Sequence, residues 1–246
     1  VLYSWSIAAA YLLMALVSPM LSSIADYTGR RRAFMRFFTW VGALSCGALF
    51  FFDRDHLEFG VIAFSLGTIG YGGSIVFYNS FLPVIAPREE QDKISARGYS
   101  MGYVGSVILL IINLLVILSP DWFGLSQNSD LPARISYLTV FARCIGLSMI
   151  TFSRLPKYTL RQRDKNSNVL LKGYREITVV SRSVFSSFRL RTFLLGFFFI
   201  MMGLLTTMFM AATYGEKELG LNDTVLIPTI LVIQLVGVAG AKLFAV

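Results

Sequence analysis

The chain has 246 residues, of which 55% are hydrophobic and 15% charged, and its mean hydropathy is +0.66. A soluble domain of this size would carry about a quarter charged residues, so the composition argues against a soluble fold. The net charge of +8 would suit nucleic acid only if basic and aromatic residues shared a face, but the basic residues lie between apolar runs. We therefore predict an all-α, polytopic helical protein whose partner is the lipid bilayer, with no nucleic acid bound.

Seven apolar segments are each about long enough to cross a hydrocarbon core roughly 30 Å thick. In chain order they are Leu2–Ile24, Phe37–Phe52, Phe59–Ile85, Tyr99–Leu118, Ile135–Phe152, Phe193–Thr213 and Val225–Val246. The gaps after the first, third and fifth segments hold 17 of the 22 basic residues, whereas the alternate gaps hold three. Because basic residues mark the cytoplasmic side, the first segment is predicted to run from outside to inside.

The cysteine and histidine residues give little indication of a catalytic site or a metal site. Cys46 and Cys144 lie far apart inside apolar segments, and His56 stands alone in a short loop. This arrangement favours small apolar helix residues over a disulfide or a metal pair, so neither a metal nor a cofactor is expected. No Ser-His-Asp set and no phosphate-cradling Gly-Lys-Ser/Thr loop is present.

The first inner loop carries the most specific pattern. Asp26 is followed by Gly29, Arg30 and Arg31, and then by Arg32. An acid at the inner end of a helix can pair with an arginine or face the N-terminus of the next helix. Gly29 supplies a backbone conformation that other residues resist. We interpret Asp26, Gly29, Arg30 and Arg31 as a conformational latch, with positive-inside charge alone as the simpler alternative.

This loop resembles the one between the second and third helices of the major facilitator superfamily, Gly-x-x-x-Asp-x-x-Gly-Arg-Lys/Arg. Ser22 stands where that family prefers glycine. The resemblance implies that the first visible helix is helix two of twelve, and that the chain is an internal fragment spanning helices two to eight.

A long basic gap divides the chain under the same resemblance. Residues 1–152 would form an incomplete N-terminal half, 153–191 a cytoplasmic loop between halves, and 192–246 the start of the C-terminal half. Apolar residues at near-helical spacing in Asn168–Phe188 predict an amphipathic helix on the inner membrane surface, although a partly ordered linker is an alternative. The two helices of the second half are expected to contact the first five only loosely.

A narrower resemblance follows from residues 70–74 (Gly-Tyr-Gly-Gly-Ser), 78–83 (Tyr-Asn-Ser-Phe-Leu-Pro), the Ser/Arg/Gly/Tyr pattern of 95–105, and 215–221 (Gly-Glu-Lys-Glu-Leu-Gly-Leu). These stretches are similar to the UMF1-type permeases, bacterial relatives of the vacuolar amino-acid effluxers linked to autophagy. The similarity implies an amino acid or another small metabolite as the solute.

Small residues recur on the helices that carry these motifs. Gly98, Gly102 and Ser106 repeat every four residues, Gly105 lies beside them, and Gly70 and Gly73 lie on the preceding helix. Such spacing flattens a helix face and lets backbones approach closely. We interpret the five glycines as packing positions, while direct solute contact remains the other use.

Polar side chains inside apolar segments are functional candidates because their burial in lipid is costly. The candidates for solute or cavity contact are Tyr78, Asn79, Asn113, Arg143, Thr206 and Gln234. Arg143 could bind a carboxylate solute, pair with an acid on another helix, or reach a headgroup region. For Asn113, Thr206 and Gln234, hydrogen bonds between helices are favoured over solute binding. The seven segments contain no Asp or Glu, so a coupling ion is not identified.

The main hypothesis is a secondary transporter that moves a small solute by alternating access. A seven-helix receptor is the alternative, but both cysteines lie within segments, no Asp/Glu-Arg-Tyr follows the third segment, and no Asn-Pro-x-x-Tyr ends the seventh. An enzyme is not expected. The protein is predicted to reside in the plasma membrane if bacterial, or in a vacuolar membrane if eukaryotic.

Overall fold

The computed structural model describes residues 2–53, 56–125, 130–156, 178–179 and 181–244. Within these residues the chain forms long helices and no strand, and seven helices are long and apolar enough to cross a membrane. The spanning helices are α1 (Leu2–Thr28), α2 (Arg31–Ala48), α3 (Leu57–Asn79), α5 (Gln91–Leu118), α6 (Leu131–Arg154), α8 (Phe188–Lys217) and α9 (Asp223–Phe244). The prediction of a polytopic helical membrane protein is confirmed.

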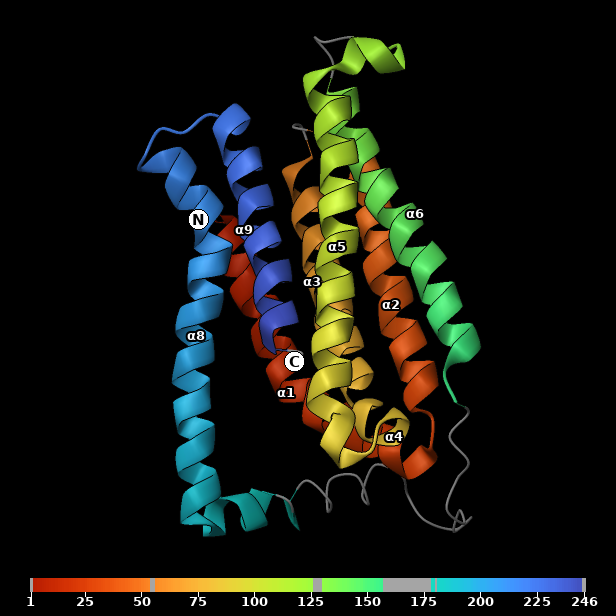
Figure 1. Cartoon of the computed structure of the whole chain (residues 1–246), viewed down its shortest axis with the longest axis vertical. Coiled ribbons are helices and arrows are strands. Elements are labelled where there is room, and N and C mark those ends of the chain that lie inside the picture. Colours follow the sequence, from red (N-terminus) through yellow and green to blue (C-terminus); the bar gives the residue numbers. More distant parts are fainter. Residues whose placement is uncertain (1, 54–55, 126–129, 157–177, 180, 245–246) are drawn as a thin grey trace.

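Short helical pieces connect these spans. The 3₁₀ turn η1 (Leu49–Phe51) extends α2, and α4 (Leu82–Ile85) with η2 (Arg88–Glu90) joins α3 to α5. The turn η3 (Pro120–Phe123) follows α5. Most basic residues of the described chain gather at the end of the bundle where α1 meets α2, which we call the basic end. It is the lower end of Figure 1.

The tightest packing joins α2 to α3. At their crossing, a Cβ built on Gly70 would lie 2.5 Å from the Cα of Gly42 and 2.8 Å from the carbonyl oxygen of Phe38. A Cβ on Gly73 would lie 2.5 Å from a carbon of the Phe38 ring. The two helices can therefore approach this closely only because both positions lack a side chain.

The hydrophobic core lies between α1, α2 and α3, toward the basic end. Phe77 and Phe81 are 2% exposed, Ala25 is fully buried, and the Phe77 ring stacks on Phe38 and on Phe34 at centroid distances of 5.9 and 5.4 Å. Stacked and edge-on aromatic pairs stabilise a core beyond the area that they bury. This core fixes the positions of the three helix ends that meet at the basic end.

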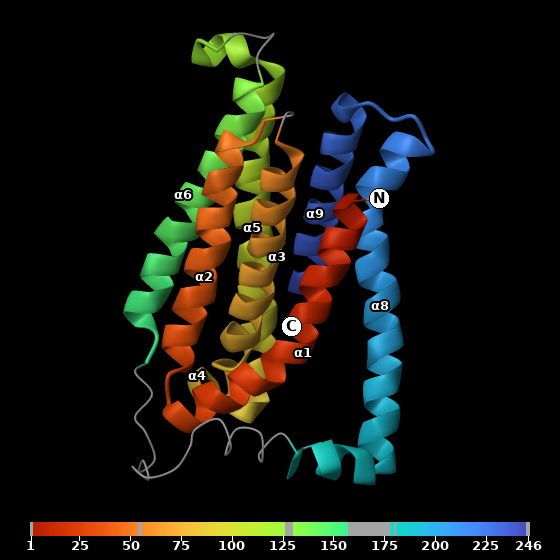
Figure 2. The same ribbon diagram turned by 180° about the vertical axis from the view of Figure 1, so that it is seen from behind.

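The helices α8 and α9 are placed differently from each other. Figures 1 and 2 show α9 alongside α5 and α8 on the far side of α9. Gly237 of α9 packs against the Tyr103 ring of α5, where a Cβ would lie 3.4 Å from the ring. The expectation of loose contact with the first five helices was therefore wrong for α9, because Gly237 admits an aromatic ring at close range. The side chains of α8 that the structure describes are mostly exposed.

Several helices begin earlier than the apolar pattern predicted. Arg31, Lys93 and Arg189 lie in the first turns of α2, α5 and α8 rather than in loops. Long basic side chains can extend toward headgroups from such positions, so charge at an interface does not end a helix. Residues 181–186 are helical, and the rest of the predicted amphipathic helix up to residue 177 lies outside the described residues.

The orientation is testable with single cysteines in a background lacking Cys46 and Cys144. Glu89 at the basic end and Glu218 at the opposite end are both exposed. We expect an impermeant thiol reagent added to intact cells to label Glu218→Cys and not Glu89→Cys, because basic residues mark the inner face. Disrupted cells, in which both cysteines should react, are the control. Labelling of Glu89→Cys from outside would reverse the orientation.

Candidate functional site at the basic end

The turn between α1 and α2 is built around Gly29. Its φ is +64°, in the left-handed region. The amide of Gly29 donates to the carbonyl oxygen of Asp26 at 3.3 Å, and the amide of Arg30 donates to that of Ala25 at 3.0 Å. These two bonds form the Schellman motif, which satisfies the last carbonyl groups of a helix and favours glycine at its left-handed position. The turn brings Asp26 and Arg31 to the same place.

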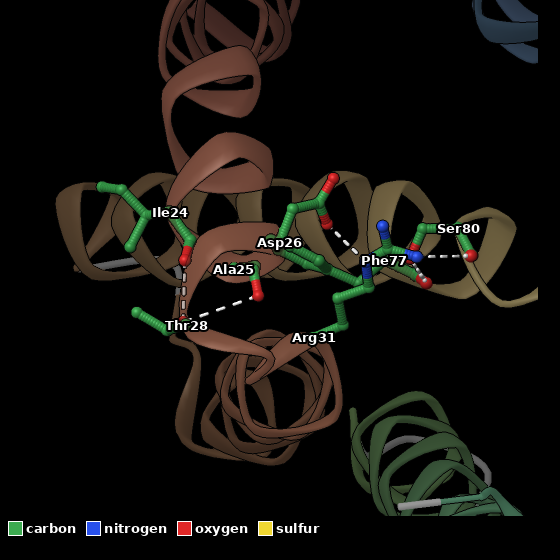
Figure 3. Close-up of polar contacts among 7 residues, drawn as sticks. All are labelled: Ile24, Ala25, Asp26, Thr28, Arg31, Phe77 and Ser80. Atoms are coloured by element: carbon green, nitrogen blue, oxygen red, sulfur yellow. Dashed lines mark hydrogen bonds and ion pairs between the residues drawn. The ribbon is translucent and has the colours of Figure 1, made fainter. Parts of the chain in front are cut away.

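Asp26 forms an ion pair with Arg31. The Arg31 Nε donates to Asp26 Oδ1, and the Arg31 Nη1 donates to the backbone carbonyl oxygen of Ser80 at 3.2 Å (Figure 3). Ser80 is the C-cap residue directly after α3, and the last carbonyl groups of a helix have no partner within it. One guanidinium therefore connects α1, α2 and the end of α3. We call Asp26, Arg31 and Ser80 the inner network.

The structure shows which of Arg30 and Arg31 pairs with Asp26, a choice that the sequence left open. The Arg31 side chain is 18% exposed and Asp26 is 45% exposed. Arg30 is exposed and contributes its backbone to the turn, with no side-chain contact to Asp26. Of the two predicted basic members of the latch, Arg31 is thus the one that pairs with the acid.

The next arginine makes a contact that sequence reasoning missed. Arg32 donates from Nη2 to the carbonyl oxygen of Phe152 and from Nη1 to that of Leu155 at 3.4 Å, both at the C-terminal end of α6. The Arg36 guanidinium lies 5.9 Å from the centre of the Phe152 ring. Cations at a helix C-terminus interact favourably with its dipole. The basic run of α2 therefore contacts the ends of three other helices, α1, α3 and α6, although positive-inside charge alone could have explained these arginines from the sequence.

The six predicted solute-contact residues are not brought together. Tyr78 and Asn79 are exposed at the end of α3, and Thr206 is exposed on α8. The Oδ1 of Asn113 accepts a hydrogen bond from Thr139 at 2.7 Å, which joins α5 to α6. Arg143 donates to Ser106 at 3.4 Å between the same helices. The Oε1 of Gln234 is buried and has no hydrogen-bond partner among the described residues. These residues occupy different depths and faces, which a sequence pattern does not reveal.

A cavity away from the basic end is lined by residues of α1, α2, η1, α3 and α6. Its volume is about 850 Å³, and its polar lining includes Ser6 and Tyr11 of α1, Thr68 and Tyr71 of α3, and Tyr137 of α6. No charged side chain lines it, and none of the six predicted solute residues does. Tyrosine and hydroxyl groups within apolar walls are typical of small-molecule pockets. The sequence offered no signal for this set because its members come from three helices.

The predicted packing glycines have unlike surroundings. Gly70 and Gly73 lie at the α2–α3 crossing, and a Cβ on Gly98 would lie 2.9 Å from the hydroxyl of Tyr78. A Cβ on Gly105 would lie 3.0 Å from Nη2 of Arg143, whereas one on Gly102 would meet no described atom within 4 Å. The regular spacing of glycines along α5 therefore does not mean that each of them contacts another helix among the described residues.

Comparison with known proteins agrees with this architecture. The family model for "Vacuole effluxer Atg22 like" proteins matches residues 1–91 and 86–246. The chain is 28% identical to an "Uncharacterized MFS-type transporter YxiO" from Bacillus subtilis over 236 residues, which are 94% of this chain and 54% of that protein. It is also 28% identical over 105 residues to "Autophagy-related protein 22" from Gibberella zeae, covering 43% of this chain and 16% of that protein.

A third relative, "Autophagy-related protein 22" from Pyricularia oryzae, is 31% identical over 84 residues, or 34% of this chain and 12% of that protein. The chain thus spans about half the length of YxiO and less of the fungal relatives. No solved structure matches. The relatives favour a membrane transporter over a receptor. The family model covers the whole length of the sequence, and the chain therefore belongs to the family of Atg22-like vacuole effluxers.

Proposed function

We propose that the full-length protein is a secondary transporter that exports a small solute, such as an amino acid, by alternating access. The observation that carries the proposal is the inner network, in which Arg31 connects α1, α2 and the end of α3. A charge cluster at one end of a bundle can stabilise one conformer and be released in the other. Efflux and the solute class are suggested by the family description and by the UMF1-type resemblance.

The arrangement of the helices supports motion between two groups. Under the proposed division into residues 1–152, 153–191 and 192–246, the contact between α9 and α5 lies between the two halves, and residues 153–191 connect them. In inverted-repeat transporters, rocking of one half against the other alternately opens a site near the middle of the membrane. We place part of the solute path in the cavity lined by Tyr11, Tyr71 and Tyr137, because its wall combines polar and apolar groups without a charge.

The test uses the full-length protein in liposomes with a panel of radiolabelled amino acids. We expect at least one to be transported faster than in empty vesicles and to exchange with unlabelled solute on the other side. Spin labels at Glu89→Cys and Arg189→Cys, both at the basic end, should report two distances whose populations shift with solute. A single fixed distance together with no transport of any amino acid in the panel would reject the proposal.

A further inference from the structure

A groove between α5 and α6 holds the one arginine that lies in the middle of a spanning helix in the described chain. Its volume is about 360 Å³, and its lining includes Gly105, Ile108, Ile112, Arg143, Gly146 and Leu147. Arg143 lies 12 residues after Leu131 and 11 before Arg154, the ends of α6. At 1.5 Å per residue this is about 17 Å from either end, so Arg143 lies at the middle of α6.

Arg143 has little to compensate its charge. An arginine guanidinium stays protonated in proteins. In the described residues its hydrogen bond is to the hydroxyl of Ser106 at 3.4 Å, and no ion pair to an acid is formed. The remaining walls of the groove are aliphatic or glycine. A charge in such surroundings is costly unless an anion accompanies it.

The shape of the groove fits a helix better than a solute. Ile108 and Ile112 are one helical turn apart along α5, and Ile108 and Leu147 are 55% and 54% exposed. A Cβ on Gly146, which lines the groove, would meet no described atom within 4 Å, so backbone surface of α6 is accessible there. Small residues in an aliphatic stripe favour close helix approach in membranes. A small-molecule site would present more convergent polar groups.

We propose that this groove receives a further membrane-spanning helix of the same full-length protein, and that this helix presents a carboxylate to Arg143. The matched region is 54% of YxiO, so a protein of that length has room for more spanning helices than the seven described. Charge complementarity specifies the chemistry of this helix: an Asp or Glu at the depth of Arg143, on a face otherwise small and apolar. The proposal goes beyond the transport function and does not depend on it.

Photocrosslinking in the full-length protein tests the docking. Benzoylphenylalanine is placed at Ile108 or Leu147 in the groove, and at Met149, 57% exposed on another face of α6, as the matched control. We expect the groove positions, and not Met149, to crosslink to a spanning peptide outside residues 1–246 that contains Asp or Glu. Mixing isotopically heavy and light protein distinguishes the same chain from a second copy. Crosslinks to lipid, to a second copy or to a helix without an acid would overturn the proposal.

A second measurement tests the charge pair through thermal stability. Arg143→Leu should lower the melting temperature, and replacing the identified acid by leucine as well should restore most of the loss. Removing one member of a buried pair leaves an uncompensated charge, whereas removing both does not. Arg143→Lys should behave close to the parent protein, and Arg134→Gln, which affects the distant Asp53 pair at 3.8 Å, is the control. Additive losses in the double variant would overturn the pair.

Discussion

Arg31→Gln in the full-length protein is expected to reduce the initial rate of solute transport at least about tenfold while leaving membrane insertion intact. The substitution removes the ion pair to Asp26 and the bond to the Ser80 carbonyl oxygen. Hydrogen bonds of charged groups contribute about 1.5–3 kcal/mol each when they are shielded from water, and 1.4 kcal/mol changes an equilibrium tenfold. Because Asp26 is 45% exposed, its pair with Arg31 contributes less, roughly 0.2–1 kcal/mol, and the bond to the Ser80 carbonyl oxygen contributes the rest.

The neighbouring arginine provides the matched control. Arg30→Gln removes the same charge from the same turn, but the Arg30 side chain is exposed and does not contact Asp26. Its transport rate should fall less than about twofold, as expected for an exposed charge. Arg31→Lys should be intermediate, since lysine can pair with Asp26 but lacks the planar fork that also reaches Ser80. Rates would be normalised to the protein in the membrane. Equal losses for Arg30→Gln and Arg31→Gln would show that net charge alone matters.

Gly70→Leu is expected to destabilise the protein strongly, and Gly70→Ala to lower its stability by about 1–3 kcal/mol, the usual cost of overpacking. Even the single Cβ would lie 2.5 Å from Gly42 Cα and 2.8 Å from the Phe38 carbonyl oxygen. Both are backbone atoms, so no side chain can rotate away and α2 must separate from α3. Thermal unfolding in detergent, followed by size-exclusion chromatography of the heated protein, would measure the loss.

Gly67→Ala provides the comparison on the same helix. A Cβ there would lie 3.6 Å from the Cβ of Ser45 on α2, which is an ordinary van der Waals contact. Alanine is favoured over glycine in a helix by roughly 1 kcal/mol, so this variant should match or exceed the parent in stability. If Gly67→Ala and Gly70→Ala lowered the melting temperature equally, the close α2–α3 crossing would not be the cause.

The inner network depends both on the Arg31 contacts and on the close crossing of α2 and α3. Phe77 lies three residues before Ser80 and packs in the core with Phe38, which itself contacts Gly73. Separation of α2 from α3 would therefore also move the Ser80 carbonyl oxygen away from Arg31. We expect Gly70→Ala to lower transport as well as stability, whereas Arg31→Gln lowers transport with a smaller effect on stability. The two variants thus separate packing from the polar contact.

The number of spanning helices and the glycine turn followed from the sequence alone. The seven apolar segments were separable because lipid requires about 20 consecutive apolar residues for each helix, and that length is visible in one dimension. The turn at Gly29 was predictable because its signal is local: an acid, a glycine and basic residues stand at fixed spacing, and the backbone at Gly29 adopts a positive φ. The positive-inside prediction likewise depends only on charge along the chain.

The partners of the charged and polar side chains were decided only by tertiary structure. Arg30 and Arg31 are adjacent and chemically identical. Only the crossing of α2 and α3 brings the Ser80 carbonyl oxygen, 49 residues away in sequence, within hydrogen-bond distance of Arg31. Arg32 reaches Phe152 across 120 residues, and Gly237 meets Tyr103 between helices that share no sequence pattern. A helix presents its residues around a full circle, so periodicity shows which residues share a face. Which other helix that face meets depends on packing between distant segments, and the side chains within reach are fixed only when those helices cross.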